Sequence, residues 1–409
     1  MRLCAGLDVS SFDMNVCVIN QEGAIVARFT VSNDYPGAAE LKDRLIHLSL
    51  SENATSLKIG LEATSVYSFH PSMYLHHDDE LKAYETQVFV INPRQVANFK
   101  KSYADMNKTD DIDAFVIADY VRFGRNQMSI VKESQYVALQ QLTRARYHLI
   151  KGLTREKQHF LQHLTYKFSA FKDEVNSSVF GAAMTELFSE KFSLEELAEL
   201  PLEDLAAYLR EKGRNRFPDA EVVASSIKKA VSESYRPDRV VEDSVDVLLA
   251  TSIELIRSYQ LQIKELDKSI TRIMTGLTQT VETIPGIGPV FAAGILAEIG
   301  QVDRFEDESK IAKYAGLYWR KRQSGRFIAE DTSLSRQGNQ YLRYYLVEAA
   351  NSVRRQVPEY HDYYKKKYHE VPKHQHKRAL VLTARKLVRL VDALLRNHQI
   401  FTPDRGVEI

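Results

Sequence analysis

Apolar and polar positions over residues 1–130 switch between the period of a strand and the period of a helix. These periods predict a β-hairpin over 3–20 and 23–31, a helix over 37–48, strands over 57–61 and 87–91, and a helix over 108–123. The hairpin turns at Asn20–Gly23, and Asn92-Pro93 stops the last strand. Strands and helices in this order predict an α/β domain.

Residues 131–280 have the pattern of long helices. Heptad-like leucines run through 134–165, and 166–239 form an inserted segment of mixed, mostly helical character. A cleaner four-three repeat with one polar interruption follows through Val245, Leu249, Ser252, Ile256, Tyr259, Ile263, Leu266, Ile270, Ile273 and Leu277. Such a repeat predicts a coiled-coil seam. Its partner could be the 134–165 helix of the same chain, a second subunit or both, and the sequence leaves this choice open.

Residues 281–409 predict a mostly α-helical domain that opens on a tight turn. The turn, Ile284-Pro285-Gly286-Ile287-Gly288-Pro289, precedes apolar residues at helical spacing. Backbone N–H groups at Gly286 and Gly288, next to a helix N-terminus, suit a phosphate group. This favours a helix-hairpin-helix-like contact to a DNA backbone, although a Pro-Gly turn between helices is often only a turn.

The composition narrows the class of protein. A chain of 409 residues with 44% hydrophobic residues suggests two or three domains with sizeable cores. Its two cysteines, Cys4 and Cys17, are too few for a disulfide framework or a cysteine-based zinc site. It shows no signal-peptide pattern and no run of 18 apolar residues. We therefore expect a soluble, cytoplasmic protein without a membrane partner.

The net charge of +1 conceals two parts of opposite charge. Residues 310–405 contain 21 Lys and Arg against 8 Asp and Glu, and the rest of the chain carries a net charge of −12. Tyrosines lie near the clusters Arg320-Lys321-Arg322 and Lys365-Lys366-Lys367. A basic surface with interleaved aromatic residues favours binding of a polyanion. A solvated helical surface is the ordinary alternative.

Four carboxylates have the placement of a metal site for phosphodiester chemistry. Asp8 and Glu62 each follow an apolar run that predicts a strand, and Asp110 and Asp113 share one face of a predicted helix. Mg²⁺ or Mn²⁺ takes oxygen ligands, and two such ions about 3.5–4 Å apart can hold both the attacking and the leaving oxygen. We predict these four residues as the catalytic metal ligands. The weaker alternatives are Asp111 and Asp13.

Ser324 is the second catalytic candidate. The cations around and after it are Arg320, Lys321, Arg322, Arg326, Arg336 and Arg343. A serine hydroxyl becomes a nucleophile when its proton is removed or the developing charge is stabilised, and arginines can hold a scissile phosphate. No His-Asp partner is evident nearby in the sequence, so an acyl-transfer triad is not supported. We predict these six cations, together with Gly286 and Gly288, as nucleic-acid contacts.

The motifs of the chain, taken in order, resemble the DEDD insertion-sequence transposases, relatives of the Piv/MooV DNA invertases and known as bridge-RNA-guided recombinases. The matching residues are Gly6-Leu7-Asp8-Val9, Leu61-Glu62-Ala63-Thr64, Lys108-Thr109-Asp110-Asp111-Ile112-Asp113-Ala114, Ile284-Pro285-Gly286-Ile287-Gly288, Tyr314-Ala315-Gly316-Leu317, Gln323-Ser324-Gly325, and Gly338-Asn339 with Leu342-Arg343. The resemblance extends from about residue 3 to about residue 350 and is weakest over 166–239.

This resemblance implies a RuvC-like, RNase H-type fold for residues 1–130, in which Asp8, Glu62, Asp110 and Asp113 bind Mg²⁺. It implies a C-terminal transposase domain with Ser324 as the nucleophile, a covalent 5′-phosphoserine link and a Holliday junction. The implied partners are donor and target double-stranded DNA, a noncoding bridge RNA, and further copies of the chain in a dimer of dimers with composite active sites. Such a prokaryotic enzyme would associate with the nucleoid when active.

The chain departs from the family motifs at two positions, and three other functions remain as alternatives. Ser65 stands where many relatives have glycine, and Trp319 stands where proline is common. The acids alone also suit a metal-dependent Holliday-junction nuclease that cuts by water attack. A decayed site would leave a nucleic-acid-binding protein without activity. An actin-like sugar kinase resembles this chain only at Gly6–Ser11, and the basic C-terminal part argues against it.

Overall fold

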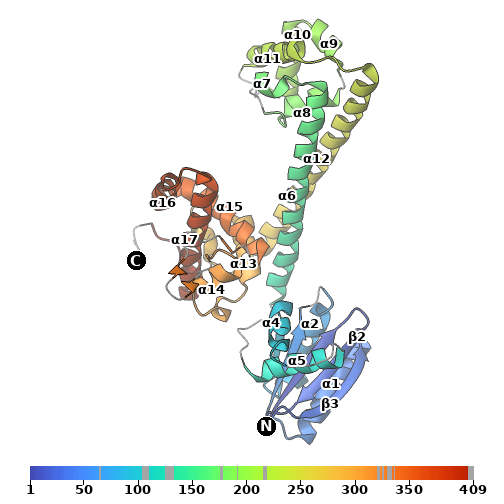
Figure 1. Cartoon of the computed structure of the whole chain (residues 1–409), viewed down its shortest axis with the longest axis vertical. Helices are drawn as coiled ribbons and strands as arrows, with labels where there is room; N and C mark the ends of the chain where they lie inside the picture. The colour runs from blue at the N-terminus through green and yellow to red at the C-terminus, as the bar shows by residue number, and fades with distance from the viewer. Residues whose placement is uncertain are drawn as a thin grey trace. The chain divides into compact units, whose positions relative to one another are not determined.

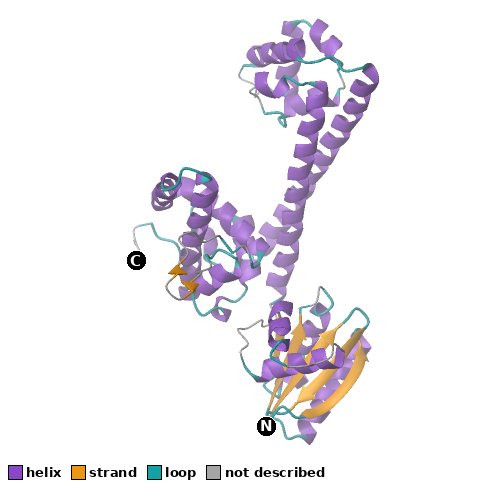
Figure 2. Ribbon diagram, in the orientation of Figure 1, coloured by secondary structure: helices purple, strands orange, loops and turns teal. Residues whose placement is uncertain are grey.

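The computed structural model describes residues 1–63, 66–103, 110–124, 133–175, 178–190, 192–214, 219–319, 323–324, 327–328, 334–335 and 337–403. For residues 110, 111, 323, 324, 327 and 328 it describes the backbone only. The chain divides into two compact units: one contains 1–137, 279–286 and 298–409, and the other contains 138–278 and 287–297. Figure 1 labels the elements of both units, and Figure 2 separates their helices from their strands.

The N-terminal part of the first unit is a mixed sheet with helices on both faces (Figure 2). Its strands are β1 (Arg2–Val9), β2 (Asp13–Ile19), β3 (Ile25–Ser32), β4 (Ser56–Glu62) and β5 (Gln87–Ile91), in the order β3-β2-β1-β4-β5. Its helices are α1 (Tyr35–Ser51), α2 (Phe69–His77), α3 (Asp79–Lys82), α4 (Pro93–Lys100) and α5 (Asp110–Arg122). The pairs β1–β2 and β2–β3 are antiparallel, whereas β1–β4 and β4–β5 are parallel. The predicted α/β character of this region is confirmed.

The predicted hairpin over 3–20 and 23–31 is wrong in one respect, because its first arm is two strands. A turn separates β1 from β2, and the Ser10 hydroxyl accepts hydrogen bonds from the backbone N–H groups of Phe12 at 3.1 Å and Asp13 at 2.9 Å. A serine side chain that replaces the backbone in this way makes a turn without glycine or proline. The apolar pattern resumes directly after it, so the sequence did not reveal it.

Strand alternation assigns the two faces of the sheet to different helices. Leu3, Ala5 and Leu7 of β1 point into a core that includes residues of α1, α2 and α3. Cys4 lies on the opposite face against Ala114 of α5, and Cys4 and Cys17 are buried, free thiols. Since successive side chains of a strand point to opposite faces, even-numbered residues of β1 face α5.

The second unit is built on two long helices, α6 (Ser134–Lys167) and α12 (Arg239–Met274), which run side by side in Figure 1. Arg146 binds Asp267, and Ser252 donates a hydrogen bond to Glu156. Later residues of one helix therefore meet earlier residues of the other, and the pair is antiparallel. The long helices predicted at 134–165 and 240–277 are confirmed, and the helix with the four-three repeat does pair within its own chain.

The segment predicted as mostly helical, 166–239, is a small helical cluster joined to these two helices (Figure 1). Its helices are α7 (Phe171–Glu174), α8 (Ala182–Ser189), α9 (Leu194–Glu199), α10 (Leu202–Lys212) and α11 (Ala220–Glu233). They share one hydrophobic core with residues of α6 and α12, including Phe160 and Leu249. A common core explains how such short helices persist, since isolated helices of this length are marginal in water.

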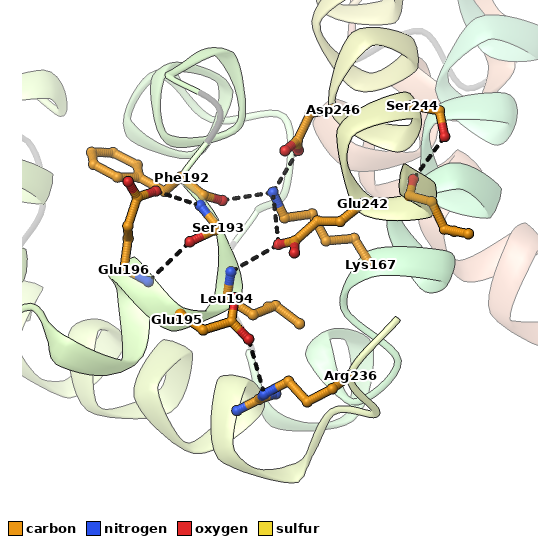
Figure 3. A network of polar contacts seen from close by, with 11 residues as sticks. Lys167, Phe192, Ser193, Leu194, Glu195, Glu196, Arg236, Glu242, Ser244 and Asp246 are labelled. Carbon is orange, nitrogen blue, oxygen red and sulfur yellow. Dashed lines mark hydrogen bonds and ion pairs between the residues drawn. The ribbon is translucent and has the colours of Figure 1, made fainter. Parts of the chain in front are cut away.

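Lys167 connects this cluster to α12 through buried charges, as Figure 3 shows. Its side chain is 2% exposed and its ammonium pairs with Asp246 and, at 3.6 Å, with Glu242. It also donates to the backbone oxygen of Phe192 at 2.6 Å, and Glu242 accepts the N–H of Leu194 at 2.9 Å. Lys167 and Glu242 therefore each have an ionic partner and a backbone hydrogen-bonding partner, and Asp246 binds the Lys167 ammonium.

The C-terminal part of the first unit is mostly helical. Its elements are η1 (Val281–Thr283), the end of α13 (Pro289–Ile299), η2 (Val302–Arg304), α14 (Glu308–Tyr314), β6 (Gln323–Ser324), β7 (Phe327–Ile328), α15 (Gln340–Gln356), α16 (Pro358–His369) and α17 (Gln375–Asn397). The last three helices pack on one another, with Tyr345, Leu346, Leu387 and Val388 fully buried. The predicted mostly helical character is confirmed, whereas the helix-hairpin-helix contact at 284–289 stays a prediction.

Removing the Lys167 charge should destabilise the second unit strongly. In Lys167→Met, the carboxylates of Asp246 and Glu242 would remain buried without their cation, a change that typically costs about 3–5 kcal/mol. Urea unfolding followed by circular dichroism would measure the loss. Lys172→Met, at an exposed position of α7, is the control and should change the unfolding free energy by less than about 0.5 kcal/mol. Equal stability of the two variants would contradict this role of Lys167.

Candidate functional site

Asp8 and Glu62 lie side by side at the carboxyl ends of two neighbouring parallel strands. β1 and β4 pair in register with Leu7 opposite Leu61, so the next residues on the two strands are Asp8 and Glu62. Both follow apolar residues that are fully buried, whereas the two acids themselves are half-buried. Strand alternation turns both side chains toward the face covered by α5.

Helix α5 approaches this face closely because two glycines make room for it. Gly6 of β1 and Gly60 of β4 are direct neighbours in the sheet. A side chain at Gly6 would overlap the backbone of α5 at Ala114 and Ala118, and one at Gly60 would overlap the side chain of Val121. The helix therefore lies almost directly on the two central strands.

This approach brings Asp113 to the other two acids. Asp113 precedes Ile117 and Val121 by one and two helical turns, and those two residues pack over Gly60. Its carboxylate therefore lies on the side of α5 that faces β4, and its negative charge acts on Glu62. Strand ends and a covering helix thus bring three of the four predicted metal ligands into one region of the domain.

The electrostatics of Glu62 reflect this crowding of negative charge. Burial raises the pKa of the Glu62 carboxyl, the charges of Asp8 and Asp113 raise it further, and Lys100 lowers it. When the pKa of a carboxyl is raised on folding, ionisation of that carboxyl lowers the free energy of unfolding. Its ionised form therefore destabilises the protein as the pH rises above the ordinary range of a glutamate. Burial and the neighbouring acids therefore disfavour the negative charge of ionised Glu62.

Lys100 lies at the acidic cluster, and the sequence analysis did not predict it there. It is the last residue of α4, and its ammonium forms an ion pair with the Asp113 carboxylate. The Lys100 and Asp113 side chains are 24% and 23% exposed, so the pair is partly screened from water. No motif contains Lys100, and only the packing of α4 against α5 places it there.

Whether these residues suit a divalent ion can be judged from their donor atoms. Carboxylate oxygens are the ligands that Mg²⁺ and Mn²⁺ prefer, and the mutual effects of Asp8, Glu62 and Asp113 indicate a surplus of negative charge. Among the side chains that the structure describes, no three acidic, His or Cys groups are close enough to hold an ion as they stand. Asp113 is occupied by Lys100, and the side chain of Asp110 lies outside the described residues. The donor atoms are of the type that suits a divalent ion.

The alternative acids behave differently. Asp13 is exposed at the start of β2, and the side chain of Asp111 is not described. A further acid, Asp119, is 5% exposed on α5 and accepts hydrogen bonds from the Tyr103 hydroxyl and, at 2.6 Å, from Arg122. Arg122 also donates to the backbone oxygen of Gln21 at 3.2 Å. This second cluster is neutralised and ties the residues after α4 to α5.

The predicted serine and cations are only partly covered by the structure. Ser324 lies in β6 opposite Phe327 of β7, and the backbone alone is described there. Arg320, Lys321, Arg322, Arg326 and Arg336 lie outside the described residues. Their predicted contacts with nucleic acid therefore stay predictions.

Of the three other predicted contacts, Gly286 and Arg343 have local structural explanations. Gly286 adopts a φ of +95°, and a Cβ at this position would be crowded by the backbone of Ser352 and Val353. Gly288 has open space beside it. Arg343 donates to the backbone oxygen of Ala315 at 3.0 Å. Gly286 and Arg343 therefore have roles in packing, whatever else they bind.

Comparison with known proteins adds an independent finding. Residues 5–169 match the DEDD transposase family of the IS110 type, and residues 278–365 match the transposase family of IS116, IS110 and IS902. The two matches together cover more than half of the chain, and the first one contains Asp8, Glu62, Asp110 and Asp113. The chain belongs to this transposase family. It is a DNA transposase, an enzyme that cuts and rejoins DNA.

Individual relatives extend the similarity over most of the transposase. It is 28% identical to the 44.8 kDa protein of insertion element IS116 from Streptomyces clavuligerus over 79% of this chain and 80% of that protein. It is 25% identical to the 42 kDa protein of insertion element IS900 from Mycobacterium paratuberculosis over 98% and 97%. A transposase for IS1111A from Coxiella burnetii is 27% identical over 36% of this chain and 38% of the relative. None of the helices described in this transposase has the length and apolarity to cross a membrane.

The two glycines give a test of how the transposase positions Asp113. Gly6→Ala should destabilise the protein by about 3 kcal/mol, because the methyl group meets backbone atoms that cannot change rotamer. Gly60→Ala should cost about 1 kcal/mol, because the methyl group meets side chains that can move. Thermal unfolding of both variants measures the difference. A Gly6→Ala variant as stable as Gly60→Ala would show that α5 does not depend on this close approach.

Proposed function

We propose that this transposase is an RNA-guided DNA recombinase with two catalytic elements, an acidic metal site and a serine nucleophile. Asp8, Glu62, Asp110 and Asp113 form the acidic site, and Ser324 attacks the scissile phosphate. A noncoding bridge RNA selects donor and target DNA by base pairing. The observation that carries the proposal is the gathering of Asp8, Glu62 and Asp113 on α5 and two parallel strand ends, in a member of the DEDD transposases.

The arrangement of the sheet supports a RuvC-like, RNase H-type domain. Two acids extend from adjacent central strands, and a third comes from a helix that crosses them. Bound Mg²⁺ would supply charge neutralisation and polarisation of the phosphate. The four carboxylates would hold it, because their surplus negative charge attracts a divalent cation such as Mg²⁺ or Mn²⁺.

The serine chemistry follows from the charges around Ser324. Its hydroxyl loses a proton and attacks phosphorus, a P–O bond forms, and the 3′ oxygen of the cut strand leaves and takes up a proton. This yields a 5′-phosphoserine link, which a 3′-hydroxyl of another strand can reverse. Arg320, Arg322 and Arg326 would stabilise the negative charge that develops on the phosphate oxygens.

A basic surface on α16, α17 and their connection supports binding of the DNA backbone. Residues 361–378 contain six Lys and Arg and two Asp and Glu. Glu370 binds Lys367 and Arg378. Within the described part of the chain, no ion pair involves the exposed residues Lys365, Lys366, Lys373 and Lys377. Cations without an internal partner are available for phosphates, and their binding releases counterions.

Several copies of the chain would be needed for recombination of two duplexes. We propose a dimer of dimers in which the acidic site of one subunit acts with Ser324 of another. For both the bridge RNA and this assembly, the support is the membership of the chain in the DEDD transposase family. A structured noncoding segment beside the gene, with loops that match both element ends and insertion site, would be the corresponding genetic observation.

Ser324→Ala should abolish the protein–DNA adduct while DNA binding remains. The measurement is denaturing gel electrophoresis of labelled donor DNA after incubation with the transposase, guide RNA and Mg²⁺. Asp113→Asn should also remove the adduct, because the acidic site then lacks one ligand. Junction cleavage by Ser324→Ala without any adduct would instead support the metal-dependent nuclease that uses water. If the wild type also gave no Mg²⁺-dependent product, the result would support a protein that only binds nucleic acid.

Charge reversal on the basic surface should weaken DNA binding. Lys366→Glu with Lys373→Glu should lower affinity and reduce the salt dependence by about one unit of slope for each lost phosphate contact. Fluorescence anisotropy at several salt concentrations measures both. The matched control is Lys172→Glu with Lys264→Glu, which removes two exposed lysines elsewhere. Equal losses in the two double variants would mean that net charge, rather than this surface, drives binding.

A further inference from the structure

We propose that Lys100 is an internal counter-ion of the acidic site and competes with the divalent ion for the Asp113 carboxylate. In the metal-free protein its ammonium would neutralise part of the carboxylate cluster. When the metal binds, Lys100 would release Asp113 and leave its oxygens free for coordination. This inference rests on the proposed metal site.

The position of Lys100 is determined by the packing of α4. Val96 is 3% exposed, and the ring of Phe99 packs edge-on against Tyr120 of α5 at 5.3 Å between ring centroids. Lys100 directly follows Phe99 at the end of the helix, so its side chain begins beside α5. The neighbouring Lys101 is exposed and forms no ion pair among the described residues. One of two adjacent lysines therefore faces the acids and the other faces solvent.

The charges explain why Lys100 takes this position. Asp8, Glu62 and Asp113 act on one another as like charges, and Lys100 is the cation that opposes them at Glu62. Like charges repel one another more strongly at a half-buried site than in bulk water, because the effective dielectric constant is lower there. A cluster of carboxylates without any cation would therefore be strained. A single ammonium relieves part of this repulsion and leaves the cluster negative.

A metal ion and the Lys100 ammonium cannot both use Asp113 fully. The ammonium binds carboxylate oxygens through its N–H donors, and the metal ion needs the lone pairs of the same oxygens. Two cations at one carboxylate also repel each other. In the described structure the ammonium contacts Asp113, so the two cations would meet at this carboxylate. Metal binding at Asp113 would therefore weaken the Lys100–Asp113 pair.

The alternative is an ion pair that only holds α4 to α5. Both roles predict that loss of the lysine lowers stability without metal, so stability alone does not separate them. They differ in the metal dependence. Competition predicts tighter metal binding when Lys100 is removed, whereas a purely structural pair predicts unchanged or weaker binding.

The test is thermal unfolding of the full-length protein without DNA, in EDTA and across titrations of Mg²⁺, Mn²⁺ and Ca²⁺. Lys100→Met should melt below the wild type in EDTA, and its half-saturating metal concentration should fall by about fivefold, a change of about 1 kcal/mol. Lys100→Arg retains a cation and should behave as the wild type. Lys101→Met is the matched control and should leave both measurements unchanged.

The outcomes separate this inference from the metal site on which it rests. A wild-type protein stabilised by metal, with the same half-saturation in Lys100→Met, would overturn the competition and leave the metal site intact. Weaker metal binding in Lys100→Met would overturn it as well. A wild-type protein that no divalent ion stabilises would overturn both proposals together. Asp113→Asn should lose the metal response, which identifies the carboxylate concerned.

Discussion

The close contact between α5 and the two central strands is the constraint on which the N-terminal site depends. Gly6 and Gly60 are neighbours on β1 and β4, and both face α5. A helix held at a normal distance by larger side chains would carry Asp113 away from the strand ends. The absence of two side chains therefore sets the position of a carboxylate several residues away. The glycines act on the site through packing, and they need not contact any ligand.

Two groups of carboxylates in this protein differ in how completely lysine neutralises them. At Lys167, one buried ammonium has two carboxylates, and backbone groups of Phe192 and Leu194 complete the network. At Lys100, one ammonium pairs with Asp113, and the pKa of Glu62 is raised by burial and by the charges of Asp8 and Asp113. The first arrangement satisfies its charges within the protein. The second leaves an excess of negative charge, which a bound cation would remove.

Much of the acidic site could be predicted from the sequence, because its residues follow local patterns. Asp8 and Glu62 end apolar runs, and the register of β1 and β4 then places them together. The turn at Ser10 was missed because a serine side chain replaced the usual glycine or proline. Lys100 could not be found in this way, because it reaches Asp113 through the packing of two helices. Long helices were evident from their period, whereas their antiparallel pairing depends on contacts such as Arg146 with Asp267.

The unequal distribution of charge along the chain has a consequence for DNA binding. A phosphodiester backbone is repelled by an uncompensated cluster of carboxylates, and the chain outside residues 310–405 carries a net charge of −12. The region of +13 supplies the opposing attraction, and its exposed residues Lys365, Lys366, Lys373 and Lys377 form no ion pair within the described part of the chain. Under the proposed mechanism, these lysines would hold DNA at the protein. Cations bound at the carboxylates would remove the repulsion that otherwise keeps a phosphate away from them.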